Sequence, residues 1–133
     1  MLKRSSARGF TLIEVLIVVT LVVILASIGM STYTNSVNRT REAVLKEDLF
    51  RMRDAIDQFY ADRNQYPQSL QDLVSEGYLR EIPKDPMTNS AETWNVEQSE
   101  NDANNPAAAA GIKDVRSGSE DVSPLDGSKY AEW

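Results

Sequence analysis

Two residue types that carry much of protein chemistry, cysteine and histidine, are missing from this 133-residue chain. Without cysteine the chain can form neither a disulfide framework nor a thiolate zinc site, although this absence alone does not fix the compartment. Without histidine it lacks the commonest general base, which excludes Ser-His-Asp and Cys-His catalysis. No Gly-rich phosphate loop or convergent nucleophile is visible either. We therefore expect no enzyme, with no catalytic and no cofactor-binding residues.

An excess of positive charge is also missing. The chain has 14 basic and 20 acidic residues, for a formal net charge of −6. Lys3, Arg4 and Arg8 all precede Gly9, so removing that leader would change the side-chain charge to −9. An acidic body repels phosphate backbones and anionic lipid surfaces. The composition therefore argues against nucleic-acid binding.

Charge is almost absent from the 21 residues from Phe10 to Met30. As a helix this apolar run would cover roughly 31 Å, about one hydrocarbon thickness. It is predicted to cross a membrane, with the basic leader in the cytoplasm and the C-terminal body on the other side. The alternative is a secretory signal peptide cut near Ser27 to Gly29. The run is longer than the apolar region of an ordinary signal peptide, which favours the membrane span.

Glu14 is the one charged residue in this run. A charge deep in a bilayer costs roughly 2.5 to 3.5 kcal/mol, so an intramembrane carboxylate indicates a functional site with a partner. A cut between Gly9 and Phe10 would create an amine four residues from Glu14, on the same helix face. In an assembly, the amine of one subunit could also meet the carboxylate of another. The alternative is that Glu14 only extends toward the membrane interface.

The segment "RGFTLIEVLIVV", Arg8 to Val19, resembles the prepilin peptidase recognition site of type IV pilins and type II secretion pseudopilins. The resemblance implies cleavage after Gly9, N-methylation of Phe10 and a charge-pairing role for Glu14 in a homo-oligomeric helical filament. It also implies a single-pass inner-membrane protein whose C-terminal domain and filament lie in the periplasm. The partners it implies are the prepilin peptidase, minor pseudopilins and an inner-membrane assembly platform.

Beyond the span, apolar residues recur at spacings that place them on one face of a helix. The charged residues between them are predicted to lie on the other faces of that helix. The predicted apolar face comprises Val37, Val44, Leu45, Leu49, Met52, Ile56, Phe59 and Tyr60, and the charged faces include Glu42 and Arg53. No proline interrupts residues 10–66, which predicts one helix of about fifty residues. Many family members carry a proline where this chain has Ser31, so local melting of the helix is in doubt here.

Pro67 predicts that the long helix ends near Asp62 to Tyr66. The "SLQD" segment, Ser69 to Asp72, predicts the start of a short helix closed by Gly77. Strands are predicted over 93–96 and 112–115, separated by a loop over 99–111 in which a helical turn at 107–110 is an alternative. The fold class is α+β, with a leader over 1–9, a transmembrane or filament-core helix over 10–30 and a globular domain over 31–133. Residues 66–88 also resemble the connection after the long helix in G-type major pseudopilins.

The C-terminal segment carries acidic residues among serine and glycine, namely Asp114, Glu120, Asp121 and Asp126. On composition alone this is either a solvated loop or a site for a hard cation that takes six to eight oxygen ligands. G-type pseudopilins bind calcium in the loop before a C-terminal tryptophan, and "SGSED" and "LDGSKYAEW" resemble the two limbs of that loop. The resemblance implies Ca²⁺ bound by the side chains of Asp121 and Asp126 and by backbone oxygens around Gly118 and Leu125.

These observations favour a structural subunit that polymerises into the pseudopilus of a type II secretion system and drives export of folded proteins. The alternative is the major pilin of a type IV pilus for adhesion or motility. Many Gram-negative pilins close a C-terminal loop with a disulfide, so the absence of cysteine argues against that alternative. A third class is a membrane-anchored binding module that never polymerises.

Overall fold

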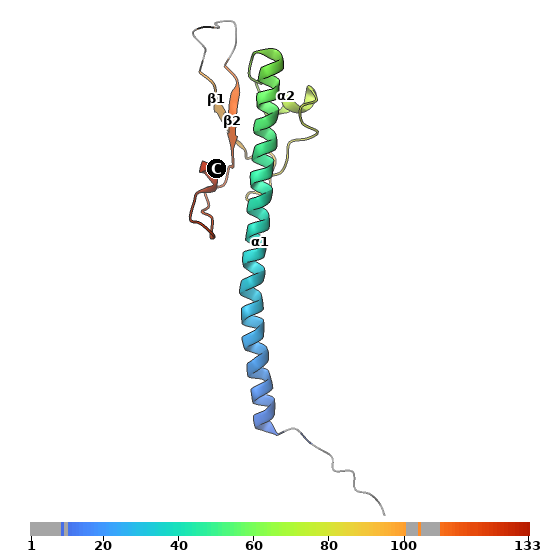
Figure 1. The fold of residues 1–133 in the computed structure, drawn as a ribbon, viewed down its shortest axis with the longest axis vertical. Coiled ribbons are helices and arrows are strands. Elements are labelled where there is room, and N and C mark those ends of the chain that lie inside the picture. Colours follow the sequence, from blue (N-terminus) through green and yellow to red (C-terminus); the bar gives the residue numbers. More distant parts are fainter. Residues whose placement is uncertain (1–8, 10, 101–103, 105–109) are drawn as a thin grey trace, which may run out of the picture. The chain divides into compact units, whose positions relative to one another are not determined.

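The computed structural model describes residues 9, 11–100, 104 and 110–133. Two helices, α1 (Leu12–Arg63) and α2 (Leu70–Ser75), are followed by the strands β1 (Asn95–Gln98) and β2 (Ile112–Arg116) and by a 3-10 helix, Tyr130–Glu132 (Figure 1). The chain divides into two compact units, residues 1–37 and 38–133, and we describe each by itself. The α+β class predicted from the sequence is confirmed.

The long helix predicted from the unbroken pattern is confirmed, and α1 runs for 52 residues. Ser31, where many family members carry a proline, is helical, and so is the nearby Gly29. The helix ends where Asn64 adopts a left-handed conformation with φ of 53°, which asparagine tolerates better than most residues. Its N–H still donates to the carbonyl oxygen of Tyr60 at 2.8 Å, which satisfies one of the last orphan acceptors of the helix.

The core of the second unit forms on one face of α1, because that face meets both α2 and β2. The side chains contributed by α1 are Leu45, Leu49, Met52, Ala55, Ile56 and Phe59, and those from other segments are Leu73, Trp94, Ile112, Val115 and Tyr130. Figure 1 shows the two strands along one side of this part of α1 and α2 along another. The segment 38–63 of α1 therefore organises the rest of the unit.

Three assignments of helix face were wrong. Val44 and Tyr60, predicted on the apolar face, are 45% and 39% exposed, and Glu42, predicted on a charged face, is buried. The reason is geometric: Glu42 precedes the buried Leu45 by three residues and shares its face, whereas Val44 is turned away by about 100°.

The short helix α2 begins as the sequence predicts. Ser69 is the N-cap residue, and the Asp72 carboxylate accepts the backbone N–H groups of Gln68 and Ser69 at 2.9 and 3.1 Å. This acid therefore satisfies donors at the start of the helix. Beyond its end, Gly77 has φ of 83°, a conformation that glycine adopts without steric cost.

The sheet has two antiparallel strands, in which Val96 pairs with Val115 and Glu97 with Asp114. The second strand is confirmed over 112–115 and includes Arg116, but the first begins two residues later than predicted, at Asn95. Residues before Asn95 are held by the preceding turn instead: the Trp94 indole N–H donates to the Pro83 carbonyl at 2.8 Å. Most of the alternative helical turn at 107–110 lies outside the described residues.

Leu45→Ala should lower the free energy of unfolding of the second unit by about 2 to 5 kcal/mol, because it empties a fully buried core position. The neighbouring Val44→Ala is the matched control. Since Val44 is exposed, its truncation should change the unfolding free energy by no more than about 0.5 kcal/mol. Denaturant unfolding of the full chain in detergent measures both, and equal losses would contradict the assigned core.

Candidate functional site

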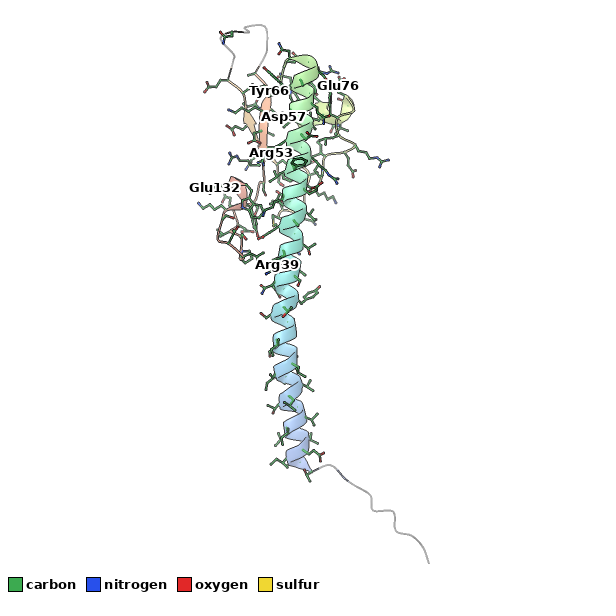
Figure 2. All side chains as sticks on the ribbon, viewed as in Figure 1. Arg39, Arg53, Asp57, Tyr66, Glu76 and Glu132 are labelled. Atoms are coloured by element: carbon green, nitrogen blue, oxygen red, sulfur yellow. The ribbon has the colours of Figure 1, made fainter. Side chains whose placement is uncertain are left out.

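The first part of α1 has no core to pack against. Its large apolar side chains are exposed on every side (Figure 2), and the exposed fractions range from 48% at Val15 to 82% at Leu12. The helix contains a stretch long and apolar enough to cross a membrane. So large an apolar surface indicates contact with lipid or with other protein chains.

Four hydroxyl side chains in this part of α1 are satisfied without water. The hydroxyl groups of Thr20, Ser27, Thr32 and Thr34 each donate to the carbonyl oxygen four residues earlier, at 2.7 to 3.2 Å. A hydroxyl in hydrocarbon needs such a partner, because no solvent is available there. These hydrogen bonds suit an apolar surrounding.

Glu14 lies in the first turn of α1. Its backbone N–H donates to the Thr11 hydroxyl at 3.3 Å, and a negative charge at this end of a helix interacts favourably with the helix dipole. Glu14 also lines a hollow of about 230 Å³ whose other walls are Val15, Val18 and Val19. Among the described residues, the aliphatic walls of this hollow offer the carboxylate no counter-charge.

The predicted cleavage site lies just ahead of this helix. Gly9 is exposed and not helical, whereas Phe10 lies outside the described residues. Exposed, non-helical backbone is what a peptidase requires. Cleavage after Gly9, methylation of Phe10 and the assembly role of Glu14 all stay predictions.

Glu42, another carboxylate on α1, lies in the protein interior, unlike Glu14. Glu42 is buried, and its Oε1 atom accepts hydrogen bonds from the Ser123 hydroxyl and, at 2.8 Å, from the Tyr130 hydroxyl. Burial, followed by the hydrogen bond to Glu42, raises the pKa of Tyr130 to about 12. These two bonds tie the C-terminal segment to α1.

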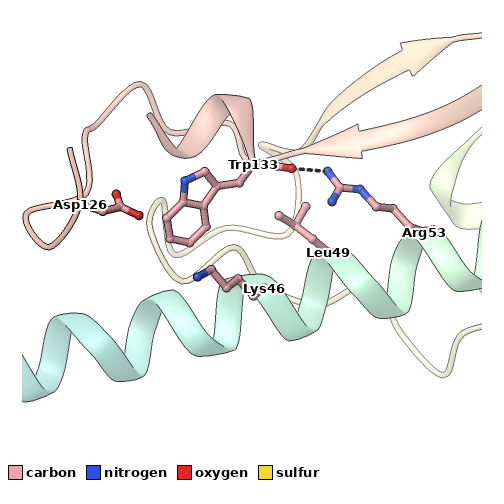
Figure 3. Close-up of a pocket in the computed structure, with 5 residues that line it drawn as sticks. All are labelled: Lys46, Leu49, Arg53, Asp126 and Trp133. Atoms are coloured by element: carbon pink, nitrogen blue, oxygen red, sulfur yellow. Dashed lines mark hydrogen bonds between the residues drawn. The ribbon is translucent and has the colours of Figure 1, made fainter. Parts of the chain in front are cut away.

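A hollow of about 300 Å³ lies between α1 and the end of the chain (Figure 3). Arg53 donates to the Asp114 carboxylate at 2.8 Å, to the Val115 carbonyl at 3.0 Å and to the backbone oxygen of Trp133 at 2.7 Å. The Lys46 ammonium lies 4.7 Å from the centre of the Trp133 ring, within the range of a cation–π contact. Asp114, predicted as part of an acidic cluster, is therefore the partner of Arg53.

The two predicted side-chain ligands for calcium line different hollows. Asp126 lies in the hollow of Figure 3, and its Oδ1 atom accepts the backbone N–H and the hydroxyl of Ser128 at 2.9 and 2.6 Å. Those bonds, the hydroxyl bond foremost, lower the pKa of Asp126. Asp121 lines another hollow, beside Arg41 and Tyr130. Within residues 9, 11–100, 104 and 110–133, no three acidic, histidine or cysteine side chains form a metal-binding group.

The two predicted backbone ligands belong to separate turns. The Gly118 N–H donates to Asp85 at 3.2 Å, and the Leu125 N–H donates to the Ser123 hydroxyl at 3.2 Å. The Gly118 backbone also passes so close to Thr93 that a Cβ atom would lie 1.8 Å from the Thr93 carbonyl oxygen. Carboxylate and carbonyl oxygens remain suitable donors for a hard cation, and calcium binding stays a prediction.

Asp85 is a buried carboxylate that sequence reasoning missed. It accepts the Ser117 hydroxyl at 2.6 Å, the Gly118 N–H at 3.2 Å and the Met87 N–H at 2.9 Å. In the part of the chain that the structure describes, no buried side-chain nitrogen or oxygen lacks a partner. Asp85 and Glu42 therefore anchor the two ends of the segment 117–130. The sequence signal for Glu42 is its helical spacing of three and seven residues from Leu45 and Leu49, whereas Asp85, between Lys84 and Pro86, carries no such signal.

Comparison with known proteins agrees with these features. Residues 4–30 match the family model described as a prokaryotic N-terminal methylation motif. The chain is 30% identical over 104 residues to type II secretion system core protein G of Aeromonas hydrophila, covering 66% of this chain and 73% of the relative. The same protein of Vibrio cholerae is 30% identical, with 67% and 71% covered, and that of Klebsiella michiganensis is 29% identical, with 64% and 71% covered. No solved structure matches.

A long helix whose apolar first part carries one carboxylate, a methylation motif at its start and a small α+β unit built on its second half together define a pilin-like subunit. Within that class, the chain belongs to the family of type II secretion system core protein G, the major pseudopilins.

Tyr130→Phe should destabilise the second unit at neutral pH by about 1.5 to 3 kcal/mol, because it removes a hydrogen bond to a buried carboxylate. The pKa of Tyr130 is raised on folding, so its stabilising contribution is complete below pH 10 and is lost as the pH rises through about 12. The difference in unfolding free energy between the unsubstituted chain and this variant should therefore shrink above pH 10. Tyr33→Phe, at an exposed position, is the control, and a pH-independent difference would contradict the assignment.

Proposed function

We propose that this pseudopilin is cleaved after Gly9 and polymerises into the filament of a type II secretion system, where the filament drives export of folded proteins. The observation that carries the proposal is the exposed apolar surface of α1 with Glu14 as its one charge. That surface needs to be covered, first by lipid and then by the same helices of other subunits. The role of the protein is structural, in keeping with a family of filament subunits.

Glu14 provides the pairing group of this assembly. Cleavage creates an amine on Phe10, and the carboxylate of a neighbouring subunit neutralises it within the apolar filament core. Neither charge is stable there alone, because an unpaired ion in a low-dielectric surrounding keeps its full desolvation cost. Pairing between subunits removes both penalties only when the subunits are in register.

The orientation of the chain in the membrane follows from the positive charge of its leader. Lys3, Arg4 and Arg8 stay in the cytoplasm, where the prepilin peptidase reaches the Gly9–Phe10 bond, and the second unit lies in the periplasm. Minor pseudopilins and an inner-membrane assembly platform are the further partners of this arrangement. The names of the relatives favour secretion over the alternative of an adhesive or motile type IV pilus.

We also propose that the C-terminal segment binds Ca²⁺ through carboxylate oxygens of Asp121 and Asp126 and backbone oxygens around Gly118 and Leu125. A bound cation would supply positive charge to an acidic segment and stabilise its loop. The chain's own contribution is the hydrogen bonding of this segment to Glu42 and Asp85, which holds the loop against α1.

The mature protein should begin at Phe10. Mass spectrometry of the membrane-extracted chain should show loss of residues 1–9 and one added methyl group, because the Gly9–Phe10 bond lies beside the basic leader at the edge of the span. Gly9→Val, which adds a branched side chain at the cut, should leave the leader attached. An intact leader in the unsubstituted chain, or a cut near Gly29, would contradict the proposal.

Glu14→Val should leave membrane insertion intact or easier, because it removes the desolvation cost of a charge. It should strongly reduce filament yield, because the Phe10 amine then lacks its partner. Thr20→Val, which removes a polar side chain from the same helix, is the control. Membrane fractionation and sedimentation of filaments measure the two effects, and an unchanged filament yield would rule out the pairing role.

Calcium should raise the thermal midpoint of the second unit. A ligand that binds only the folded state stabilises it by about 2.7 kcal/mol at a hundredfold excess over Kd. Asp121→Asn and Asp126→Asn should each reduce the heat measured when metal-free full chain in detergent is titrated with calcium, whereas Asp57→Asn, on the exposed face of α1, should not. If millimolar calcium gives neither heat nor a shift in melting, the segment is a solvated acidic loop held by hydrogen bonds alone.

A further inference from the structure

Negative charge is unevenly distributed along this acidic chain. Only one of its 20 acidic residues lies before Glu42. The first charged residues beyond the apolar run are two arginines, Arg39 and Arg41, which follow the uncharged helical segment 31–38. Glu42 itself is buried, and the next acidic residue along α1, Glu47, lies eight residues beyond Arg39. The helix surface at the start of the second unit is therefore positive, although the chain as a whole is acidic.

Both guanidinium groups are accessible to a ligand. Arg39 and Arg41 are exposed, and Figure 2 shows Arg39 on α1, at the beginning of the second unit. Within the described residues no salt bridge engages either side chain. This includes Asp121, which lines the same hollow as Arg41. Two helix positions correspond to a rotation of about 200°, so the two arginines face in nearly opposite directions and reach separate anions.

The spacing between the arginines and the apolar run suits the surface of a membrane. Arg39 follows Met30 by nine residues, all helical, which corresponds to a rise of about 14 Å. The headgroup layer on each side of a bilayer is about 5 to 8 Å thick. Helical side chains lean toward the N-terminus of their helix, which here is toward the membrane, and the long aliphatic stem of arginine carries its charged end farther. With residues 10–30 in the hydrocarbon, the guanidinium group of Arg39 reaches the phosphate layer, and Arg41 lies only about 3 Å farther along α1.

We propose that Arg39 and Arg41 bind phospholipid phosphate groups where α1 leaves the membrane. This proposal rests on the proposed function, in which the chain is inserted in the membrane before assembly, and it adds a site that fixes the depth of the helix. Phosphate is the complementary ligand, because a guanidinium group stays charged and presents several N–H donors in a planar fork that matches phosphate oxygens. The competing partners are exposed carboxylates of a second copy, which contain no phosphorus.

The test measures the distance from arginine to lipid phosphorus. The full chain, with ¹³C in its guanidinium carbons, is reconstituted in phosphate-free buffer into vesicles of phosphatidylcholine and phosphatidylglycerol. Arg4→Lys and Arg8→Lys keep the charge of the leader but remove its guanidinium carbons, so every labelled arginine lies in the second unit. Solid-state NMR should then show a dipolar coupling between ¹³C and ³¹P that corresponds to roughly 4 to 5 Å, as expected for a hydrogen-bonded pair of guanidinium and phosphate.

Two double variants assign the coupling to these positions. Arg39→Gln with Arg41→Gln should abolish it and leave the melting temperature unchanged, because both side chains are exposed. Arg39→Lys with Arg41→Lys keeps both positive charges and should also abolish it, because the labelled carbons are gone. The matched control is Arg51→Gln with Arg80→Gln, which removes two other exposed arginines of the second unit and should retain the coupling.

The outcomes separate this site from the proposed function. If the chain floats with the vesicles but shows no coupling, or if the coupling persists without Arg39 and Arg41, the lipid site is overturned and membrane insertion stands. Absence of coupling is also the result expected if carboxylates of a second copy hold the two arginines. If the chain does not float with the vesicles, the proposed function itself fails, and the lipid site fails with it.

Discussion

The structure depends on one requirement. The exposed apolar surface of the first part of α1 needs to be covered, and the Glu14 carboxylate within it needs a positive charge as its partner. The side chains from Leu12 to Met30 are exposed in the isolated chain, and Glu14 has only valine side chains around its hollow. Lipid supplies the cover but not the charge. Under the proposed function, other copies of the same helix supply both once the chain has been cut, and assembly is then more favourable than the isolated state.

Another carboxylate of α1, that of Glu42, has its hydrogen-bonding requirement met inside the subunit. Glu42 is buried and receives the hydroxyl groups of Ser123 and Tyr130. Asp85 is satisfied in the same way by Ser117 and two backbone N–H groups. Glu42 is a carboxylate that stabilises the fold, whereas Glu14 is the one that we propose pairs with another subunit. Burial of Glu42 also fixes the C-terminal segment on α1.

The sequence alone was sufficient to predict the helices and strands whose formation depends on a local residue pattern. The absence of proline predicted α1, Ser69 and Asp72 predicted the start of α2, and Val and Ile predicted β2. The resemblance around Arg8 to Val19 predicted the family. The sequence was not sufficient where distant segments decide the outcome. Glu42 reads as a surface residue until Ser123 and Tyr130 are placed beside it, and the start of β1 depends on the hydrogen bond from Trp94 to Pro83.

The most direct test of the account is the distance between the Phe10 amine and the Glu14 carboxylate in the assembled filament. Solid-state NMR on filaments mixed from one batch labelled with ¹⁵N-phenylalanine and another labelled with ¹³C-carboxyl glutamate reports only contacts between subunits. The account predicts a dipolar coupling between the N-terminal amine nitrogen and a glutamate carboxyl carbon that corresponds to an ion pair, at about 4 Å or less, and its loss with Glu14→Gln. Filaments that show no coupling between the two batches would contradict it.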